Sequence, residues 1–182
     1  QALPLCLKEI KEVIKSNQIQ AEIIVSDSSS DNSPEIAKNT NEIILIKHDK
    51  KGYGNAYLEA FKIVKGKYIF MADADLTYDF NYIPEFLNEL KKGNDFIIGN
   101  RFTKNMEKNS MPLTHKYIGN PILSFTLRLL FNTKIKDSHC GMRAIKKQAL
   151  DKLNLQTTGM EFASEMIIKA LKYFIQNILY TI

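Results

Sequence analysis

Apolar residues recur in two alternating patterns along the first hundred residues of the chain. Short runs rich in β-branched and aromatic residues, such as AEIIVSD and KYIFMAD, are typical of strands, and the segments around them carry apolar side chains at helical spacing. The strand pattern predicts four strands, at residues 21–27, 42–48, 67–73 and 95–101. The helical spacing predicts four helices that precede or separate them, at residues 5–16, 34–40, 50–66 and 80–93.

The predicted strands end in polar or glycine-containing groups. Strands that are apolar on both faces and alternate with amphipathic helices indicate an α/β fold with a mostly parallel sheet, covered by helices on both faces. In such sheets, ligands bind beyond the carboxyl ends of the strands. We therefore expect one site at this edge, formed by Asp27, the turn 51–54, Asp73 with Asp75, and residues 99–101.

The pattern changes after about residue 103. A polar connection, TKNMEKNSMP, leads to a predicted helix near residues 115–131, and a dense polar segment, KDSHCGMRAIKK, precedes a last helical stretch from about residue 159. At 182 residues the chain is long enough for one domain. We therefore expect a single domain over residues 1–182, whose second half caps the sheet and does not fold independently.

Charge and composition narrow the classes of ligand only slightly. Lys and Arg number 25 against 20 Asp and Glu, a net charge of +5, and hydrophobic residues make up 45% of the chain. The excess favours anionic ligands, such as a phosphate-rich substrate or an anionic membrane surface, and is too diffuse to indicate nucleic acid. The two cysteines, Cys6 and Cys140, match no metal-ligand spacing, and we expect buried or free reduced thiols.

No segment of the sequence reaches the ~18 to 20 apolar residues that span a bilayer. The nearest, YIGNPILSFTLRLLFNT, is interrupted by Pro121 and Arg128. We therefore predict a cytoplasmic protein that is at most peripheral at the inner face of the membrane. The candidate for surface binding is residues 116–131, where Lys116 and Arg128 accompany many apolar side chains; core packing of this helix is the alternative.

Two aspartates, Asp73 and Asp75, follow the third predicted strand with only Ala74 between them. Two like charges this close repel, and burying either is costly unless a positive partner arrives. Residues i and i+2 of an extended segment project to the same side, so both carboxylates can face one Mg²⁺ or Mn²⁺ ion. A calcium loop is excluded because Tyr78 and Pro84 stand where glycine and glutamate are required. A solvated turn is the remaining alternative.

Six blocks in order, EIIVSDSSSDNS, KGYGNA, GKYIFMADAD, GNRF, DSHCGMRA and GMEFASEM, carry a family resemblance. Over roughly residues 5–172 the chain resembles the family 2 glycosyltransferases, and it is most similar to bacterial relatives of polyprenyl-phosphate (dolichyl-phosphate) hexose synthases. The resemblance implies a GT-A-like, Rossmann-like fold, with a nucleotide-sugar-binding half at about 5–102 and an acceptor-side cap at about 103–182.

The same resemblance implies a reaction and its partners. The expected reaction is a metal-dependent, inverting transfer of a hexose from a UDP- or GDP-sugar to a polyprenyl phosphate at the membrane surface, with Mg²⁺ or Mn²⁺ as cofactor. Asp27 and Ser28 match the positions that hold the nucleoside, and Lys51 and Gly52 match the glycine turn beside them. No nucleic acid is expected as a partner.

The resemblance also assigns the metal site and the catalytic residues. Asp73, Ala74 and Asp75 match the segment around the metal and the diphosphate, with the two carboxylates as metal ligands. Arg101 and Arg143 fall where the lipid-phosphate enzymes place arginines against phosphate, a contact that the guanidinium fork suits. These two arginines and Asp75 are the expected catalytic residues.

Several of these side chains keep a second interpretation. Arg101 can be a surface charge, and Arg143 can form a structural ion pair with Asp137. Glu161 and Glu165 lie four residues apart on one helical face and are either solvated or candidates for a general base. A lipid-phosphate acceptor is already anionic and needs no base, whereas a sugar-hydroxyl acceptor would need a carboxylate such as Asp137 or Glu161.

The chain departs from the family pattern at both ends. The strand with which family members begin is missing, and FIQNILYTI does not continue into the usual glycine, strand and basic segment. We therefore expect a domain truncated at both ends. Two alternatives to the expected function stay open: a truncated nucleotide-binding module without turnover, and a glycosyltransferase that acts on a sugar hydroxyl in polysaccharide synthesis. A sugar-phosphate nucleotidyltransferase is disfavoured because the chain lacks its glycine- and arginine-rich phosphate loop.

Overall fold

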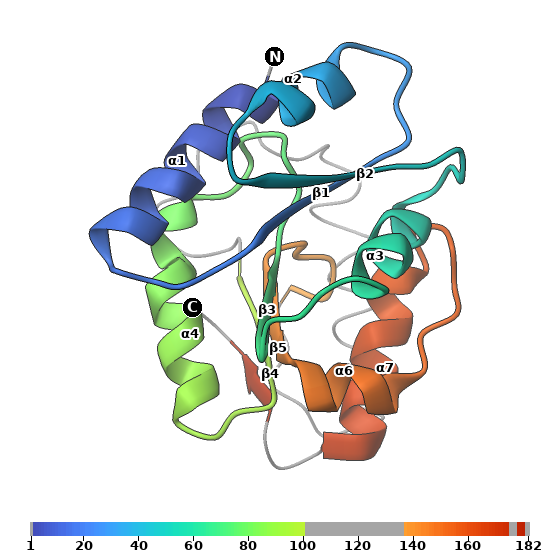
Figure 1. The fold of residues 1–182 in the computed structure, drawn as a ribbon. Helices are drawn as coiled ribbons and strands as arrows, with labels where there is room; N and C mark the ends of the chain where they lie inside the picture. Colours follow the sequence, from blue (N-terminus) through green and yellow to red (C-terminus); the bar gives the residue numbers. More distant parts are fainter. Residues whose placement is uncertain (1, 101–136, 175–177, 181–182) are drawn as a thin grey trace.

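The computed structural model describes residues 2–100, 137–174 and 178–180, and Figure 1 shows the fold. The strands are β1 (Ile23–Asp27), β2 (Ile43–Lys47), β3 (Tyr68–Met71), β4 (Phe96–Ile98), β5 (Arg143–Lys146) and β6 (Ile178–Tyr180). The helices are α1 (Ala2–Ser16), α2 (Ser33–Asn39), α3 (Tyr53–Phe61), α4 (Ile83–Lys91), α6 (Lys147–Leu153) and α7 (Phe162–Phe174), with a 3₁₀ helix η1 (Phe80–Tyr82). The strands and helices predicted for the first hundred residues are confirmed.

The described strands form two sheets. β1 and β2 pair in parallel, which places Asp27 opposite Lys47 at their carboxyl ends. The larger sheet has the order β3-β5-β4-β6. In it β5 runs antiparallel to both of its neighbours, and β6 runs parallel to β4. The α/β class is confirmed, and β5 is the antiparallel exception inside the larger sheet.

Two strands lie where the hydrophobic pattern predicts none. β5 forms within the polar segment KDSHCGMRAIKK, and its first three residues are buried between β3 and β4. β6 lies in FIQNILYTI, so the expectation that this stretch contains no strand is wrong. Both strands are only three or four residues long and gain their order from backbone pairing with a neighbour. A free strand edge attracts such pairing, and it is invisible in the local pattern.

Helices cover both faces of the larger sheet, as predicted (Figure 1). α4 packs against β3, β4 and β5 on one side, and α6 and α7 lie on the other. The main hydrophobic core fills the space between them, where Phe86 of α4, Phe96 of β4 and Phe162 of α7 are completely buried. A smaller apolar cluster joins α1 to α2 and to the β1–β2 sheet.

An apolar cavity of about 890 Å³ lies between β1 and β3 and is also lined by α1, α3 and α4. In the part of the chain that the structure describes, β1 pairs only with β2, and β3 pairs only with β5. A strand that paired with both β1 and β3 would therefore lie in this cavity and join the two sheets. The absence of a first strand stays a prediction, and the cavity is the place where that strand would lie.

Local chemistry sets the beginning of α2 and the end of α4. Ser33 is the first residue of α2, and the N-cap Asn32 makes no side-chain capping bond. The carboxylate of Asp31 instead accepts a hydrogen bond from the backbone N–H of Ser33 at 2.9 Å. Gly93 follows α4 with φ of 116°, the left-handed conformation in which a glycine commonly ends a helix.

Cys6 and Cys140 form no disulfide and are completely buried, as expected. Within the described ranges, no helix is both long enough and apolar enough to cross a bilayer. The helix predicted at 115–131 and its surface-binding face at 116–131 lie outside the described residues.

Candidate functional site

Asp27 ends β1 and begins a polar loop that lines a pocket of about 520 Å³. The residues that line this pocket are Asp27, Ser28, Ser29, Ser30, Asp31 and Lys51. Three residues predicted to bind one ligand, Asp27, Ser28 and Lys51, are therefore brought together around one pocket. The pocket lies beyond the carboxyl ends of the parallel strands β1 and β2, where ligands bind in α/β sheets.

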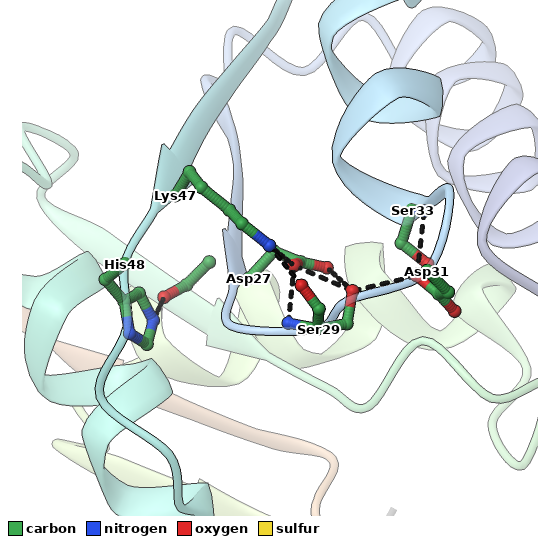
Figure 2. Close-up of polar contacts among 7 residues, drawn as sticks. Asp27, Ser29, Asp31, Ser33, Lys47 and His48 are labelled. Atoms are coloured by element: carbon green, nitrogen blue, oxygen red, sulfur yellow. Dashed lines mark hydrogen bonds and ion pairs between the residues drawn. The ribbon is translucent and has the colours of Figure 1, made fainter.

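The carboxylate of Asp27 is held by its own loop and by the end of β2 (Figure 2). Its Oδ1 accepts hydrogen bonds from the backbone N–H of Ser29 at 2.8 Å and from the ammonium of Lys47 at 3.2 Å. The Ser29 hydroxyl lies 2.9 Å from Oδ1 and 3.1 Å from Oδ2, and it also lies 2.8 Å from Oδ1 of Asp31. The side chain of Asp27 is only 11% exposed, so these contacts fix it at the wall of the pocket.

Lys47 and His48 lie beside Asp27, although the sequence patterns did not single them out. The ammonium of Lys47 contacts both the Asp27 carboxylate and the backbone carbonyl of Ser29. His48 Nε2 lies 3.1 Å from Ser26 Oγ, and among the described residues its buried Nδ1 has no hydrogen-bond partner. In the sequence, the position of Lys47 at the end of a predicted strand is the feature that could have indicated it. Only the strand register shows that Lys47 lies opposite Asp27.

The turn before α3 needs its glycines because another backbone approaches it closely. Gly52 has φ of 121°, a left-handed conformation that favours glycine. A Cβ atom there would lie 2.4 Å from the carbonyl oxygen of Thr158, and one at Gly54 would lie 2.2 Å from that of Thr157. The structure thus gives Gly52 a steric role in placing the turn that carries Lys51.

Asp73 and Asp75 follow β3 and differ in their surroundings. Asp73 is half-buried, and its Oδ1 accepts a hydrogen bond from the phenol of Tyr57 at 3.2 Å. Asp75 is exposed, and its Oδ1 accepts from the backbone N–H of Thr77 at 2.9 Å. Burial, and then repulsion from Asp75, raise the pKa of Asp73 above its ordinary value. The pair therefore carries negative charge that its protein surroundings do not fully compensate.

The segment DSHCGMRA reaches the aspartate pair through Gly141. A Cβ atom at Gly141 would lie 2.4 Å from Oδ2 of Asp73 and 2.9 Å from the phenol oxygen of Tyr78. The backbone N–H of Gly141 donates a hydrogen bond to that phenol at 2.7 Å. This block is one of the six that carry the family resemblance. Its contact with Asp73 was not predicted, because no spacing along the chain could indicate it.

The aspartate pair fits Mg²⁺ or Mn²⁺ by the chemistry of its donors. Mg²⁺ in proteins is typically bound by one or two carboxylates and completes its coordination with water and substrate phosphates. Within the described ranges, no group of three or more His, Cys, Asp or Glu side chains is placed to hold a metal ion. Asp73 and Asp75 are thus suited to an ion that arrives together with a phosphate ligand. Their role as metal ligands stays a prediction.

Arg143 has backbone partners in the structure. It is 1% exposed, and its guanidinium donates to the carbonyls of Cys140 at 2.8 Å, Ala163 at 2.9 Å and Ser138 at 3.1 Å. These three bonds hold the segment before β5 against α7. The structure therefore favours a structural role for Arg143, and a direct contact with phosphate stays a prediction.

Four candidate site residues remain, and the structure describes three of them. Arg101 lies outside the described residues. The carboxylate of Glu161 accepts a hydrogen bond from the backbone N–H of Gly159 at 2.9 Å, and Asp137 is buried at 2% exposure. The carboxylate of Glu165 accepts hydrogen bonds from the loop that precedes α7. The three carboxylates considered as a general base are therefore engaged or buried.

The chain has relatives of known name. A low-salt glycan biosynthesis hexosyltransferase, Agl6, of Haloferax volcanii is 43% identical over 166 residues, which cover 91% of this chain and 40% of Agl6. A dolichyl-phosphate hexose transferase of the same organism is 29% identical over 170 residues, which cover 93% of this chain and 71% of that enzyme. The chain thus spans less than half of the first relative and most of the second.

A solved structure has the same fold as this chain, and a family model matches most of the chain. Glucosyl-3-phosphoglycerate synthase from Mycobacterium tuberculosis, in complex with Mn²⁺, UDP-glucose and phosphoglyceric acid, superposes with a TM-score of 0.72 at 17% identity, over 95% of this chain and 64% of that one. At this identity the likeness establishes the GT-A-like fold. The model of the family described as glycosyl transferase family 2 matches residues 1–153. Because this match covers most of the chain, the protein belongs to glycosyl transferase family 2.

Proposed function

We propose that the protein is a metal-dependent, inverting glycosyltransferase that moves a hexose from a nucleoside-diphosphate sugar to a polyprenyl phosphate. The observation that carries the proposal is the pocket at the carboxyl ends of β1 and β2, where Asp27 and Lys51 lie together. The aspartate pair follows β3, and Asp73 lines the cavity that β1 and β3 share. Hydrogen-bond acceptors, a cation and a potential metal site thus occur at neighbouring strand ends.

The proposed donor complex uses these groups in distinct ways. The Asp27 carboxylate would accept hydrogen bonds from the nucleoside, and the ammonium of Lys51 would face its phosphates. Asp73 and Asp75 would hold Mg²⁺ or Mn²⁺, which neutralises charge on the departing nucleoside diphosphate when bound. The mycobacterial synthase with this fold binds Mn²⁺ together with UDP-glucose, which supports the choice of donor and metal. The sugar and the base are left open between UDP- and GDP-hexoses.

The proposed acceptor is a polyprenyl phosphate. One relative is named for transfer of a hexose to dolichyl phosphate. A phosphate oxygen is anionic near neutral pH and needs no general base, which agrees with the engaged state of Glu161 and Glu165 and the burial of Asp137. Such an acceptor presents its phosphate at the bilayer surface, so we propose that the protein works there. Arg101 is the proposed cation for that phosphate.

Calorimetry with UDP and with GDP, each with and without Mn²⁺, tests the donor site. We expect one nucleotide to bind in a metal-dependent way to the wild type and to lose that dependence in Asp75→Ala. Asp79→Asn is the matched control, because Asp79 is also an exposed aspartate of this segment and its carboxylate accepts hydrogen bonds only from Asn81 among the described residues. Metal-independent binding of both nucleotides, or none, would contradict the proposal.

A second candidate is a nucleotide-binding module without turnover. The cavity between β1 and β3 favours it, because an incomplete sheet next to Asp73 would leave the donor pocket open on one side. Transfer of labelled hexose from the nucleotide sugar that calorimetry selects to a lipid extract separates the two. Labelled lipid formed by the 182-residue chain alone would exclude the module.

A further inference from the structure

A carboxylate in the second half of the chain holds the loop 156–159, which precedes α7. Glu165 lies in the first turn of α7, and its side chain is 12% exposed. Its Oε1 accepts from the backbone N–H of Gln156 at 3.0 Å, and its Oε2 accepts from the backbone N–H of Thr157 at 2.9 Å and from the Thr157 hydroxyl at 2.6 Å. Lys169, one turn further along α7, pairs with Oε1 at 2.7 Å.

These contacts keep Glu165 ionised. Burial acts to raise its pKa, but hydrogen bonds from Lys169, Thr157 and Gln156 outweigh burial and hold the pKa of Glu165 at about 2. Hydrogen bonds to a charged group are the stronger kind, so the loop is attached to α7 by several such bonds at one point. This arrangement does not suit a general base, which must be free to take up a proton.

The loop 156–159 in turn caps the beginning of α3. The first N–H groups of a helix have no partners within it, and the N-cap residue of α3 is a glycine, which has no side-chain oxygen to offer. Two loop carbonyls take that place: Thr158 accepts from the N–H of Asn55 at 3.0 Å, and Gly159 accepts from that of Gly54 at 3.2 Å.

The fit between the loop and the turn is tight enough to transmit a displacement. No Cβ atom can be added at Gly52 or Gly54 without striking a loop carbonyl oxygen. A shift of the loop therefore moves the turn 51–54, whose first residue, Lys51, lines the Asp27 pocket. A continuous set of contacts thus runs from the Glu165 carboxylate to the wall of that pocket.

We propose that Glu165 is a positioning residue for the nucleotide: it fixes the loop 156–159, which fixes the amino end of α3 and places Lys51 beside Asp27. The proposal rests on the proposed function, because it takes the ligand of that pocket to be a nucleoside diphosphate. It also connects the two halves of the domain, since α7 belongs to the second half and α3 to the first.

Hydrogen exchange tests the contact without any ligand. In Glu165→Gln, an amide replaces the carboxylate and cannot accept all of these bonds, so we expect the amides of Gly54 and Asn55 to exchange at least about tenfold faster. Lys169→Met is the control: it removes the ion pair on the same carboxylate and the bond from Lys169 to the carbonyl of Asn154, and it leaves the bonds between Glu165 and the loop 156–159 in place. Unchanged exchange in Glu165→Gln, or equal acceleration in Lys169→Met, would overturn the proposal.

Calorimetry with UDP and Mn²⁺, or with GDP if that nucleotide binds, tests the link to the pocket through a double-mutant cycle. We expect Glu165→Gln to weaken nucleotide binding about tenfold in the wild type and less than threefold in Lys51→Met, because the two residues act through one contact. Equal losses in both backgrounds would overturn the positioning role. If the wild type binds neither nucleotide, the proposed function fails, and the exchange experiment still decides whether Glu165 holds α3.

Discussion

Gly141 lies directly against Asp73, so that a Cβ atom at position 141 would be 2.4 Å from the carboxylate oxygen Oδ2. The phenol of Tyr78 holds the glycine in place by accepting its backbone N–H at 2.7 Å. Two motif blocks more than sixty residues apart therefore meet at one carboxylate. The absence of a side chain at Gly141 is what leaves room for the position of Asp73.

Replacing this glycine should displace the proposed metal ligand. In Gly141→Ala the added methyl group would push Asp73 aside, and we expect metal-dependent nucleotide affinity to fall at least about tenfold. Overpacking a well-packed site typically costs about 1–3 kcal/mol, so we also expect a moderate loss of stability. Calorimetry and thermal unfolding measure the two effects. Gly66→Ala is the control, and comparable loss of affinity in both variants would contradict a specific contact with Asp73.

Asp73→Asn should stabilise the protein in the absence of metal. Burial and the neighbouring Asp75 raise the pKa of Asp73, so its ionised form destabilises the folded state at neutral pH, and this penalty disappears as the pH falls through the folded pKa. The amide keeps an oxygen for Tyr57 and removes the charge. We expect a rise in Tm of about 2–4 °C, which corresponds to about 1 kcal/mol in a chain of this size.

The same variant should lose its response to metal. With nucleotide present, Mn²⁺ should raise the Tm of the wild type, because a ligand that binds only the folded state stabilises that state. The Tm of Asp73→Asn should stay unchanged, because this variant lacks one of the proposed metal ligands. Thermal unfolding with and without Mn²⁺ measures both effects. A lower Tm of Asp73→Asn in metal-free buffer, or an undiminished shift with Mn²⁺, would count against the metal site.

Glu165 should make the stability of the protein depend on pH in acid. Its folded pKa of about 2 lies below the ordinary value of 4.5, so its contribution to stability is complete above pH 4.5 and is lost as the pH falls toward 2. We expect the difference in free energy of unfolding between wild type and Glu165→Gln to be largest at pH 6 and to shrink at pH 3. Urea unfolding at the two pH values measures it. A difference that stays constant with pH would show that the carboxylate charge is not what holds the loop.

Much of the first half of the fold could be predicted from the sequence because burial leaves a periodic trace. Strands such as Ile23–Asp27 and Tyr68–Met71 are runs of apolar residues with a polar residue at or just beyond the end, and this change marks the sheet edge where the pocket lies. Asp27 and the turn that begins at Lys51 were placed together correctly for this reason. The ends of parallel strands converge whatever the details of packing.

The rest of the site depends on contacts between segments that are far apart in the chain. Arg143 has the residue type of a phosphate ligand, but three backbone carbonyls surround its guanidinium in the fold. Glu165 has the residue type of a general base, but its carboxylate accepts hydrogen bonds from a loop. The strand Arg143–Lys146 exists because β3 and β4 supply partners on both sides. Residue type indicates what a side chain can do, and its neighbours decide which possibility is realised.

The apolar cavity between β1 and β3 should accept an additional strand. Both strands line this cavity, and within the described residues each pairs on one side only. An added strand would form backbone hydrogen bonds on both sides and bury apolar side chains, each worth about 1.5–3 kcal/mol when fully buried. Placed ahead of α1, it would form a parallel βαβ unit with α1 and β1, whose connection is right-handed in nearly all proteins.

Fusing a strand of about five residues, Thr-Val-Ile-Val-Ile, with a short Asn-Gly connection ahead of Gln1 tests this prediction, since β1 has five residues. We expect a Tm at least about 4 °C higher, because net stabilisation should exceed about 1 kcal/mol after the cost of ordering the strand. The control fusion carries proline at the second and fourth positions, which removes two backbone donors while keeping the length and apolar character. It should give little or no increase. An equal increase of Tm in both fusions would mean that the added residues bind through apolar contacts alone and do not pair as a strand between β1 and β3.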